Sequence, residues 1–343
     1  MKSFVAEKFK QINPIFLSFI GILLIQLACL NSAVPTPSPI ATPGAIYNPL
    51  NHVEIPEGLR LADWQFDQQY MLLYRETVWF CEWCFGRMPL AKISLYDWQA
   101  DKIIDIKTSN PEEEFGGPPV QGQDGMIAFV TQRSDRGKIV VIDTKNKTLQ
   151  TVGEGDYLAF SPGSSKIAYW IKGNLYELDL KTLEKKRLYL IPGFNWHGGD
   201  RVNDLSWSPD GKKLTFIFST EKEGGGGGFQ DEVIVFDLVT QNFDVITINS
   251  PSIYFPVWSP DSRLIAYIES PLGKTNDINI NIMDTAQKCL AGTVNLTIGL
   301  LDRLEWSPDG SVLTFSGVDP GYLFFVDIEK VFGAPYDKLT CIQ

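Results

Sequence analysis

A four-residue motif, Trp-Ser-Pro-Asp, recurs in the second half of the chain and constrains its fold more than any other feature. Its copies lie at Trp207–Asp210, Trp258–Asp261 and Trp306–Asp309, and a divergent copy begins at Phe160. The copies follow one another at intervals of about 50 residues, which is close to the length of a four-stranded propeller blade. Ser-Pro-Asp-Gly suits a type I turn followed by a left-handed residue. We therefore expect tight hairpin turns in which Gly211 and Gly310 have positive φ.

A second repeated feature extends this pattern into the N-terminal half. Six apolar runs end in an aspartate, at a mean interval of about 46 residues: Asp97, Asp143, Asp179, Asp237, Asp284 and Asp327. An aspartate in this position accepts N–H bonds from the turn it opens, so each should end the third strand of a blade. Second strands with a small middle residue lie between the two repeats, as in Ile265-Ala266-Tyr267, and blade one has only Leu72-Leu73-Tyr74. The sequence therefore predicts an all-β protein, a six-bladed β-propeller of four-stranded antiparallel blades, over residues 60–343.

These repeats resemble the TolB-type β-propeller, a WD-like family with a Trp-Ser-Pro-Asp-Gly turn, over about residues 60–343. TolB itself carries an α/β domain before its propeller and works in an envelope complex with a peptidoglycan-associated lipoprotein. Only about 30 residues separate Cys29 from the first expected blade, which is too few for such a domain, so we do not carry that complex over. Related propellers occur in prolyl oligopeptidases, but the sequence has no Gly-x-Ser-x-Gly nucleophile motif.

The N-terminus has the pattern of an export signal. Lys2, Lys8 and Lys10 precede an uncharged stretch over residues 15–30, and a segment rich in Pro, Ser and Thr follows. We assign residues 1–28 to a signal peptide and residues 29–59 to a Pro-rich tether. Cys29 follows Leu27-Ala28 as in a bacterial lipoprotein, so we expect it to be the lipid anchor of an exported protein held at the outer or periplasmic side of a membrane. Ordinary cleavage and an uncleaved anchor are the alternatives.

Charge and cysteine content narrow the class of partner. The formal net charge is −11, and such a surface repels nucleic acid, so we expect none as a partner. Cys81 and Cys84 form a Cys-Glu-Trp-Cys motif that no helix follows, and we expect an inert disulfide. Free thiols and a metal site are the alternatives, although His52 and His197 are the only histidines to complete a metal site. Cys289 and Cys341 fall in adjacent expected blades, the latter in the last strand of blade six, and the sequence does not decide whether they pair.

All unusual segments fall in loops on one rim of the predicted ring, opposite the Ser-Pro-Asp turns. We expect binding there, and the candidate residues are Trp79, Trp83, Trp196, His197, Asp200 and Tyr254, together with Asp302 and Arg303 on the channel side of blade six. Each has a simpler structural explanation. The tryptophans can cover the disulfide, His197 can bond within its loop, and Asp302 with Arg303 can form a local ion pair.

No catalytic constellation, cofactor motif or metal-ligand set is recognisable, so we predict a non-enzymatic, monomeric propeller that binds a protein or glycan at the cell envelope. The alternative is a carbohydrate-binding or glycan-active enzyme that uses the aromatic loops and two channel carboxylates. Convergence of two acids and an aromatic residue at the channel mouth would favour the enzyme.

Overall fold

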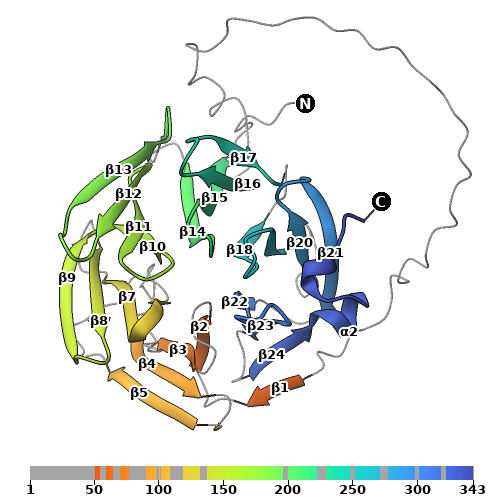
Figure 1. Ribbon diagram of the computed structural model, residues 1–343, viewed down its shortest axis with the longest axis horizontal. Coiled ribbons are helices and arrows are strands. Elements are labelled where there is room, and N and C mark those ends of the chain that lie inside the picture. The colour runs from red at the N-terminus through yellow and green to blue at the C-terminus, as the bar shows by residue number, and fades with distance from the viewer. Residues whose placement is uncertain are drawn as a thin grey trace, which may run out of the picture.

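The computed structural model shows a ring of six blades around a central axis (Figure 1), and the space along this axis is here called the channel. It describes residues 51–54, 59–64, 70–76, 90–97, 100, 102–108, 119–131, 137–195, 200–221, 229–247, 252–270, 277–297, 301–317 and 322–342. Every sheet has four antiparallel strands, so the predicted fold class is confirmed. Within the described part of the chain, no helix is long and apolar enough to cross a membrane.

The strands follow the chain from the channel outward in each of the first five blades. Blade one comprises β2 (Leu59–Asp63), β3 (Tyr70–Glu76), β4 (Leu90–Asp97) and β5 (Lys102–Thr108). Blade two comprises β6 (Val120–Gln121), β7 (Met126–Thr131), β8 (Lys138–Asp143) and β9 (Thr148–Glu154). Blade three comprises β10 (Asp156–Phe160), β11 (Lys166–Ile171), β12 (Asn174–Asp179) and β13 (Lys185–Leu190).

The second half of the ring also consists of four-stranded blades. Blade four comprises β14 (Arg201–Trp207), β15 (Lys213–Glu221), β16 (Phe229–Asp237) and β17 (Phe243–Val245). Blade five comprises β18 (Ile253–Trp258), β19 (Leu264–Glu269), β20 (Asp277–Asp284) and β21 (Cys289–Thr297). Blade six comprises β22 (Leu301–Trp306), β23 (Val312–Gly317), β24 (Tyr322–Asp327) and, as its outer strand, β1 (Asn51–Glu54).

Strand β1 closes the ring from the N-terminal side of the propeller. Asn51 pairs with Phe325 and Glu54 pairs with Tyr322, so the outer strand of blade six precedes blade one in sequence. The boundary expected at residue 60 is therefore too late, because Asn51–Glu54 and Leu59, assigned to the tether from the sequence, belong to blades. This closure joins the two ends of the repeat through the backbone hydrogen bonds of one sheet.

The Ser-Pro-Asp turns form as expected, and side chains bond across them. In blade four, Ser208 Oγ donates to Asp210 Oδ1 at 2.7 Å and accepts from Lys213 N at 2.9 Å. Blades five and six repeat both kinds of bond. Gly211 and Gly310 have φ of 73° and 74°, and Ser262, which replaces the glycine in blade five, also has positive φ at 62°. The motif thus encodes a turn with its own internal hydrogen bonds.

The predicted role of the strand-ending aspartates is also confirmed. Asp237 Oδ1 accepts from Val239 N at 2.9 Å and from Thr240 N at 2.7 Å, and the Thr240 bond is the main cause that lowers the pKa of Asp237. Equivalent bonds form at Asp97, Asp143, Asp179 and Asp284. Asp327 instead caps the short helix α2 (Ile328–Phe332) by accepting from Lys330 N at 3.0 Å. The sixth copy of the turn is therefore remodelled into a helix.

Blades one and two depart from the predicted strand alignment. Asp63 pairs with Leu72, which places Trp64 where the other blades have the motif tryptophan and makes Met71-Leu72-Leu73 the equivalent second-strand triplet. The expected triplet, Leu72-Leu73-Tyr74, is one residue too late, because blade one lacks the small middle residue that marks the others. Gln121 pairs with Ile127 and takes the tryptophan position of blade two, before a short 3-10 turn, η1 (Gln123–Gly125).

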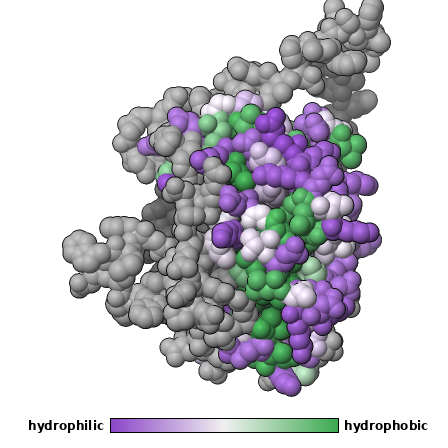
Figure 2. Space-filling view, turned by 90° about the vertical axis from the view of Figure 1, so that its left-hand side faces the viewer, coloured by the Kyte–Doolittle hydropathy of each residue, from purple (hydrophilic) through white to green (hydrophobic). Residues whose placement is uncertain are grey.

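Apolar side chains fill the spaces between adjacent blades. Trp207, Leu214 and Phe216 of blade four pack on Ala168 and Trp170 of blade three, and the same alternation recurs around the ring. The outer edge is mixed: Figure 2 views the side that bears β9 and β13 in Figure 1 and shows hydrophobic surface between hydrophilic residues. The exposed large apolar side chains of these two blades are Leu149, Leu183 and Leu190.

The C-terminal segment does not add a strand to blade six, so the placement expected for Cys341 is wrong. After α2, the short 3-10 turn η3 (Tyr336–Lys338) directs the chain back toward blade five. Ile342 N donates to Leu290 O at 2.8 Å, and Cys341 forms a disulfide with Cys289 at the start of β21, with a Cα–Cα distance of 5.6 Å. The pairing that the sequence left open is therefore present. It holds the C-terminus on blade five because β1 already occupies the outer edge of blade six.

Candidate functional site

The two rims of the ring differ in character. The Ser-Pro-Asp turns and the aspartate-led turns lie on one rim, here called the turn rim, whereas loops between second and third strands and between blades lie on the other, the loop rim. Most candidate residues from the sequence lie outside the described residues, so the structure does not place them. These are Trp79, Trp83, Trp196, His197 and the cysteines Cys81 and Cys84; the anchor candidate Cys29 also lies outside them.

Two candidates on the loop rim are described, and their surroundings differ. Asp200 is buried, and its Oδ2 accepts from Asn195 N at 2.9 Å, so this carboxylate closes the base of the loop before blade four. Tyr254 is 38% exposed and lies beside Phe255, with ring centroids 6.1 Å apart. Next to Asp200 in sequence, the guanidinium of Arg201 lies 4.4 Å from the ring centre of Phe229, and this cation–π contact is within blade four. Tyr254 is thus available for contact, whereas Asp200 serves the loop.

Arg303 lies inside the channel, and its hydrogen-bond partner is Glu305. The Arg303 Nε donates to Glu305 Oε1 at 3.0 Å, and both side chains are largely buried. Burial disfavours the charge of Arg303, but attraction to Glu305, Asp63 and Asp204 outweighs it and raises the pKa of Arg303. For Glu305, burial and the nearby Asp63 raise the pKa to about 8, although Arg303 acts in the opposite direction. Asp302 lies in β22, and the structure does not describe its side chain.

The other channel acids bind the backbone of the next blade. Asp63 Oδ2 accepts from Gln121 N at 2.9 Å, which ties blade one to blade two. Asp204 Oδ2 accepts from Phe255 N at 3.2 Å, which ties blade four to blade five. Asp204 and Phe255 have φ of 50° and 53° and lie at β-bulges of the inner strands, where the backbone bends away from its regular pairing. These carboxylates therefore help to hold the inner ring together.

Little room remains between these groups. A small central cavity is bordered by Asp63, Gln121, Arg303 and Glu305. The centre of a water-sized sphere can move through about 10 Å³ of it, so it has room for about one water molecule. Gln121 Oε1 is buried there without a hydrogen-bond partner in the described part of the chain. No group of three or more potential metal ligands occurs among the described residues. The two acids expected of a glycan-active enzyme do meet in the channel, as Asp63 and Glu305, but they lie in a space too small for a sugar ring.

Sequence reasoning singled out Arg303 and missed its three acidic neighbours. Asp63 and Glu305 each lie one residue before the motif tryptophan, and Asp204 lies three before it. The position one residue before the motif tryptophan borders the central cavity, because each inner strand runs along the channel. An acidic residue directly before Trp64 or Trp306 is therefore the sequence signal that could have predicted a carboxylate in the channel.

Comparison with known proteins places the fold. No protein-family model and no curated protein matches the sequence. Among solved structures, TolB from Acinetobacter baumannii is similar at 19% identity and a TM-score of 0.50, over 68% of this chain and 59% of that one. The fold is that of a TolB-type propeller.

Two further structures show how widely this architecture is used. A putative TolB from Agrobacterium tumefaciens matches at 16% identity and a TM-score of 0.55, over 79% of this chain and 91% of that one. An oligogalacturonate lyase in complex with manganese matches at 13% identity and a TM-score of 0.51, over 80% and 76%. At these identities the likeness establishes the fold alone, and the match spans less than two thirds of the Acinetobacter TolB chain.

Proposed function

We propose that this protein is an exported propeller, tethered to a membrane through Cys29, that binds another protein at the cell envelope and does not catalyse a reaction. The TolB-type fold supports a protein-binding role. The observation that carries the non-enzymatic part is the state of the channel. Its carboxylates are engaged with Arg303 and with backbone N–H groups, around a cavity of about one water.

The loop rim is the binding face in this proposal. It carries the segments that the sequence predicts to depart from the repeat, and Tyr254 on this rim is one of the few large apolar side chains that are exposed among the described residues. Aromatic side chains have few rotamers and make efficient contact anchors. Trp83 and Trp196 lie outside the described residues, and the sequence predicts them on loops of the same rim, so we expect them to contribute to binding.

A capture experiment with a mutational control tests this proposal. The domain from residue 51 onward is used to isolate a partner from envelope extract, and the affinity of the purified pair is measured. Trp83→Ala or Trp196→Ala should weaken binding by about 1 to 3 kcal/mol, while Lys181→Glu on the turn rim should have no effect. Turnover in a glycan and peptide substrate screen that disappears in Glu305→Gln, with folding retained, would contradict the non-enzymatic proposal.

Attachment has its own test. Cys29→Ala should release the protein from the membrane fraction, because the Pro-rich segment that follows has no other anchor in this proposal. A wild-type protein whose intact mass shows no lipid and which begins after residue 29 would refute lipidation and leave the binding proposal standing.

A further inference from the structure

The outer edge of blades two and three is basic, although the chain as a whole is acidic. Residues 138–190, which run from β8 to β13, carry nine lysines and arginines against six aspartates and glutamates, whereas the formal net charge of the whole chain is −11. Most of the exposed cations of this stretch lie in the turns before β9 and β13 and along β13 itself. Positive charge is therefore concentrated on one side of the ring.

The aspartate-led turns before β9 and β13 present lysine and leucine side chains at matching positions. Lys145 N and Lys181 N each donate to the aspartate that opens the turn, at 2.9 Å. Two residues later, Lys147 and Leu183 have φ of 56° and 58°, so the two turns share one backbone shape. Leu183 is 43% exposed, and Leu149, at the start of β9, is 51% exposed. Each turn thus places a cation and a leucine together in solvent.

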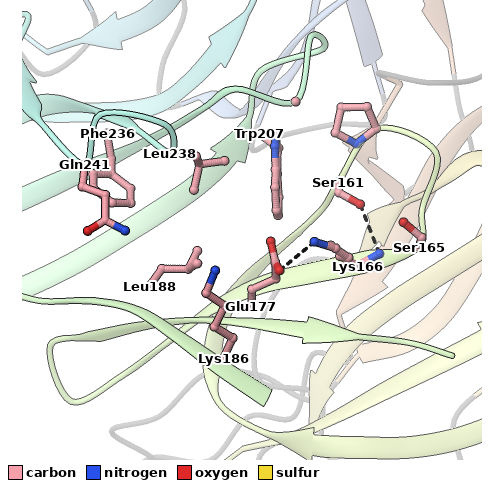
Figure 3. Close-up of a pocket in the computed structure, with 12 residues that line it drawn as sticks. Ser161, Ser165, Lys166, Glu177, Lys186, Leu188, Trp207, Phe236, Leu238 and Gln241 are labelled. Atoms are coloured by element: carbon pink, nitrogen blue, oxygen red, sulfur yellow. Dashed lines mark hydrogen bonds and ion pairs between the residues drawn. The ribbon is translucent and has the colours of Figure 1, made fainter. Parts of the chain in front are cut away.

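The cations of β13 add to this surface. Lys186 and Arg187 are exposed and form no ion pair with the described residues. Figure 3 shows Lys186 extending from β13 beside Glu177. A dashed line joins Glu177 to Lys166, which form an ion pair at 2.8 Å, and none reaches Lys186. The charge of Lys186 is therefore available to an external anion.

The equivalent turns of other blades differ. At the position of Lys147, blade four has the uncharged Gln241 and blade five has Lys288, both also at positive φ. Lys288 forms an ion pair with Asp244, whereas neither Lys147 nor Lys181 forms one with the described residues. Blade six has helix α2 in place of the turn. Unpaired cations in these turns are therefore a feature of blades two and three and not a general consequence of the repeat.

The outer parts of the two blades adjoin. Val152 of β9 packs in the same apolar cluster as Leu178 of β12, and a Cβ atom added to Gly153 would lie 3.9 Å from Leu178 Cδ2. Figure 2 faces this side of the ring and shows hydrophobic side chains among hydrophilic ones. We call this surface the basic edge, and it comprises Lys147, Leu149, Lys181, Leu183, Lys186 and Arg187.

Exposed leucines among unpaired cations suit the surface of an anionic bilayer. Lysine and arginine meet the phosphates of the headgroups, while leucine reaches the boundary between headgroups and acyl chains. A nucleic acid would engage the cations but leave the leucines in water. The remaining blades are acidic, and an anionic surface repels them, so the field of the protein turns the basic edge toward the lipid.

We propose that the basic edge binds the surface of an anionic membrane, with Leu149 and Leu183 inserted among the headgroups. Most of the edge lies toward the turn rim, so the loop rim stays accessible to a partner. The proposal goes beyond the function proposed above and needs neither Cys29 nor the loop rim, so its failure would leave that function standing.

Vesicle co-sedimentation tests the proposal without the tether. The domain from residue 51 onward contains every strand of the six sheets and so retains the complete ring. It should bind vesicles of phosphatidylcholine with about 30% phosphatidylglycerol at least about tenfold more tightly than vesicles of phosphatidylcholine alone. Lys147→Glu combined with Lys181→Glu should weaken binding to the anionic vesicles by at least about tenfold.

A control variant separates the basic edge from net charge. Lys212→Glu combined with Lys330→Glu makes the same change in net charge at exposed lysines of blades four and six, and it should alter binding by no more than about twofold. Thermal unfolding of both double variants checks that they fold. Absence of binding to anionic vesicles, equal binding to neutral ones, or an equal loss in the two double variants would overturn the proposal.

A second pair of substitutions tests the leucines. Leu149→Gln combined with Leu183→Asn leaves the charge unchanged, and asparagine tolerates the positive φ at position 183. This variant should bind anionic vesicles about fivefold more weakly, and binding equal to that of the wild type would overturn the insertion on which the proposal depends. Tighter binding to a short single-stranded DNA than to the vesicles would overturn it in favour of nucleic acid. A dimer in sedimentation that the Lys147→Glu and Lys181→Glu variant dissociates would overturn it in favour of a second copy of the chain.

Discussion

Replacing Cys341 with serine should lower the stability of the propeller by about 4 kcal/mol in the chain-entropy model of a disulfide. The two bonded cysteines are 52 residues apart, and the bond prevents this loop from opening in the unfolded chain. Both side chains are partly exposed, so a serine hydroxyl at either position can be hydrated and adds no burial penalty. For a propeller of this length, a loss of about 4 kcal/mol corresponds to a fall in Tm of about 7 °C.

Thermal unfolding of four proteins measures this effect: wild type, Cys289→Ser, Cys341→Ser and the double variant. Because one bond is removed in every case, the three variants should unfold at the same temperature, and a reductant should lower the Tm of the wild type to theirs. The segment from α2 to η3 should stay in place in the folded variants, since Arg263 still binds its carbonyl groups. A wild type that unfolds at the same temperature as Cys341→Ser, or that reductant leaves unchanged, would refute the reasoning.

Two further predictions follow from particular contacts. Gly310→Val and Gly211→Val both place a side chain at positive φ, but only the valine at position 310 would also meet the ring of Tyr336. Chemical unfolding should therefore show that Gly310→Val lowers the unfolding free energy by about 1 to 3 kcal/mol more than Gly211→Val does. Equal losses would contradict the packing of Tyr336. Burial and Asp63 raise the pKa of Glu305 to about 8, so the folded state holds a proton that the unfolded state releases near pH 4.5. The unfolding free energy of the wild type relative to Glu305→Gln should therefore fall from about pH 5 to about pH 8, by on the order of a few kcal/mol, and a constant difference would show that Glu305 is ionised throughout.

The sequence predicts the ring well because its turns carry their own chemistry. Ser208 with Asp210, and Asp237 with its following N–H groups, form bonds that depend on residues close in sequence, so the motif alone reveals the turn. The closing strand β1 has no such motif. It is held by pairing with β24, at the opposite end of the propeller sequence, and this pairing leaves no pattern in the strand itself.

The candidate site could be predicted only in part for the same reason. The acidic neighbours of Arg303 come from blades one, four and six, and only closure of the ring brings them together. The sequence predicts a last strand of blade six around Cys341, because every complete blade needs a fourth strand. Instead Phe332 and Tyr336 fill a groove, since the edge that such a strand would need is already taken by β1.

Hydrogen–deuterium exchange on the complex with a captured partner tests most directly whether the loop rim binds protein. Peptides covering residues 77–89, 195–200 and 252–255 should become protected when the partner is added, while the exchange of Asp63, Glu305 and their neighbours in the channel stays the same. Protection confined to other parts of the ring, with these three segments unchanged, would contradict the account.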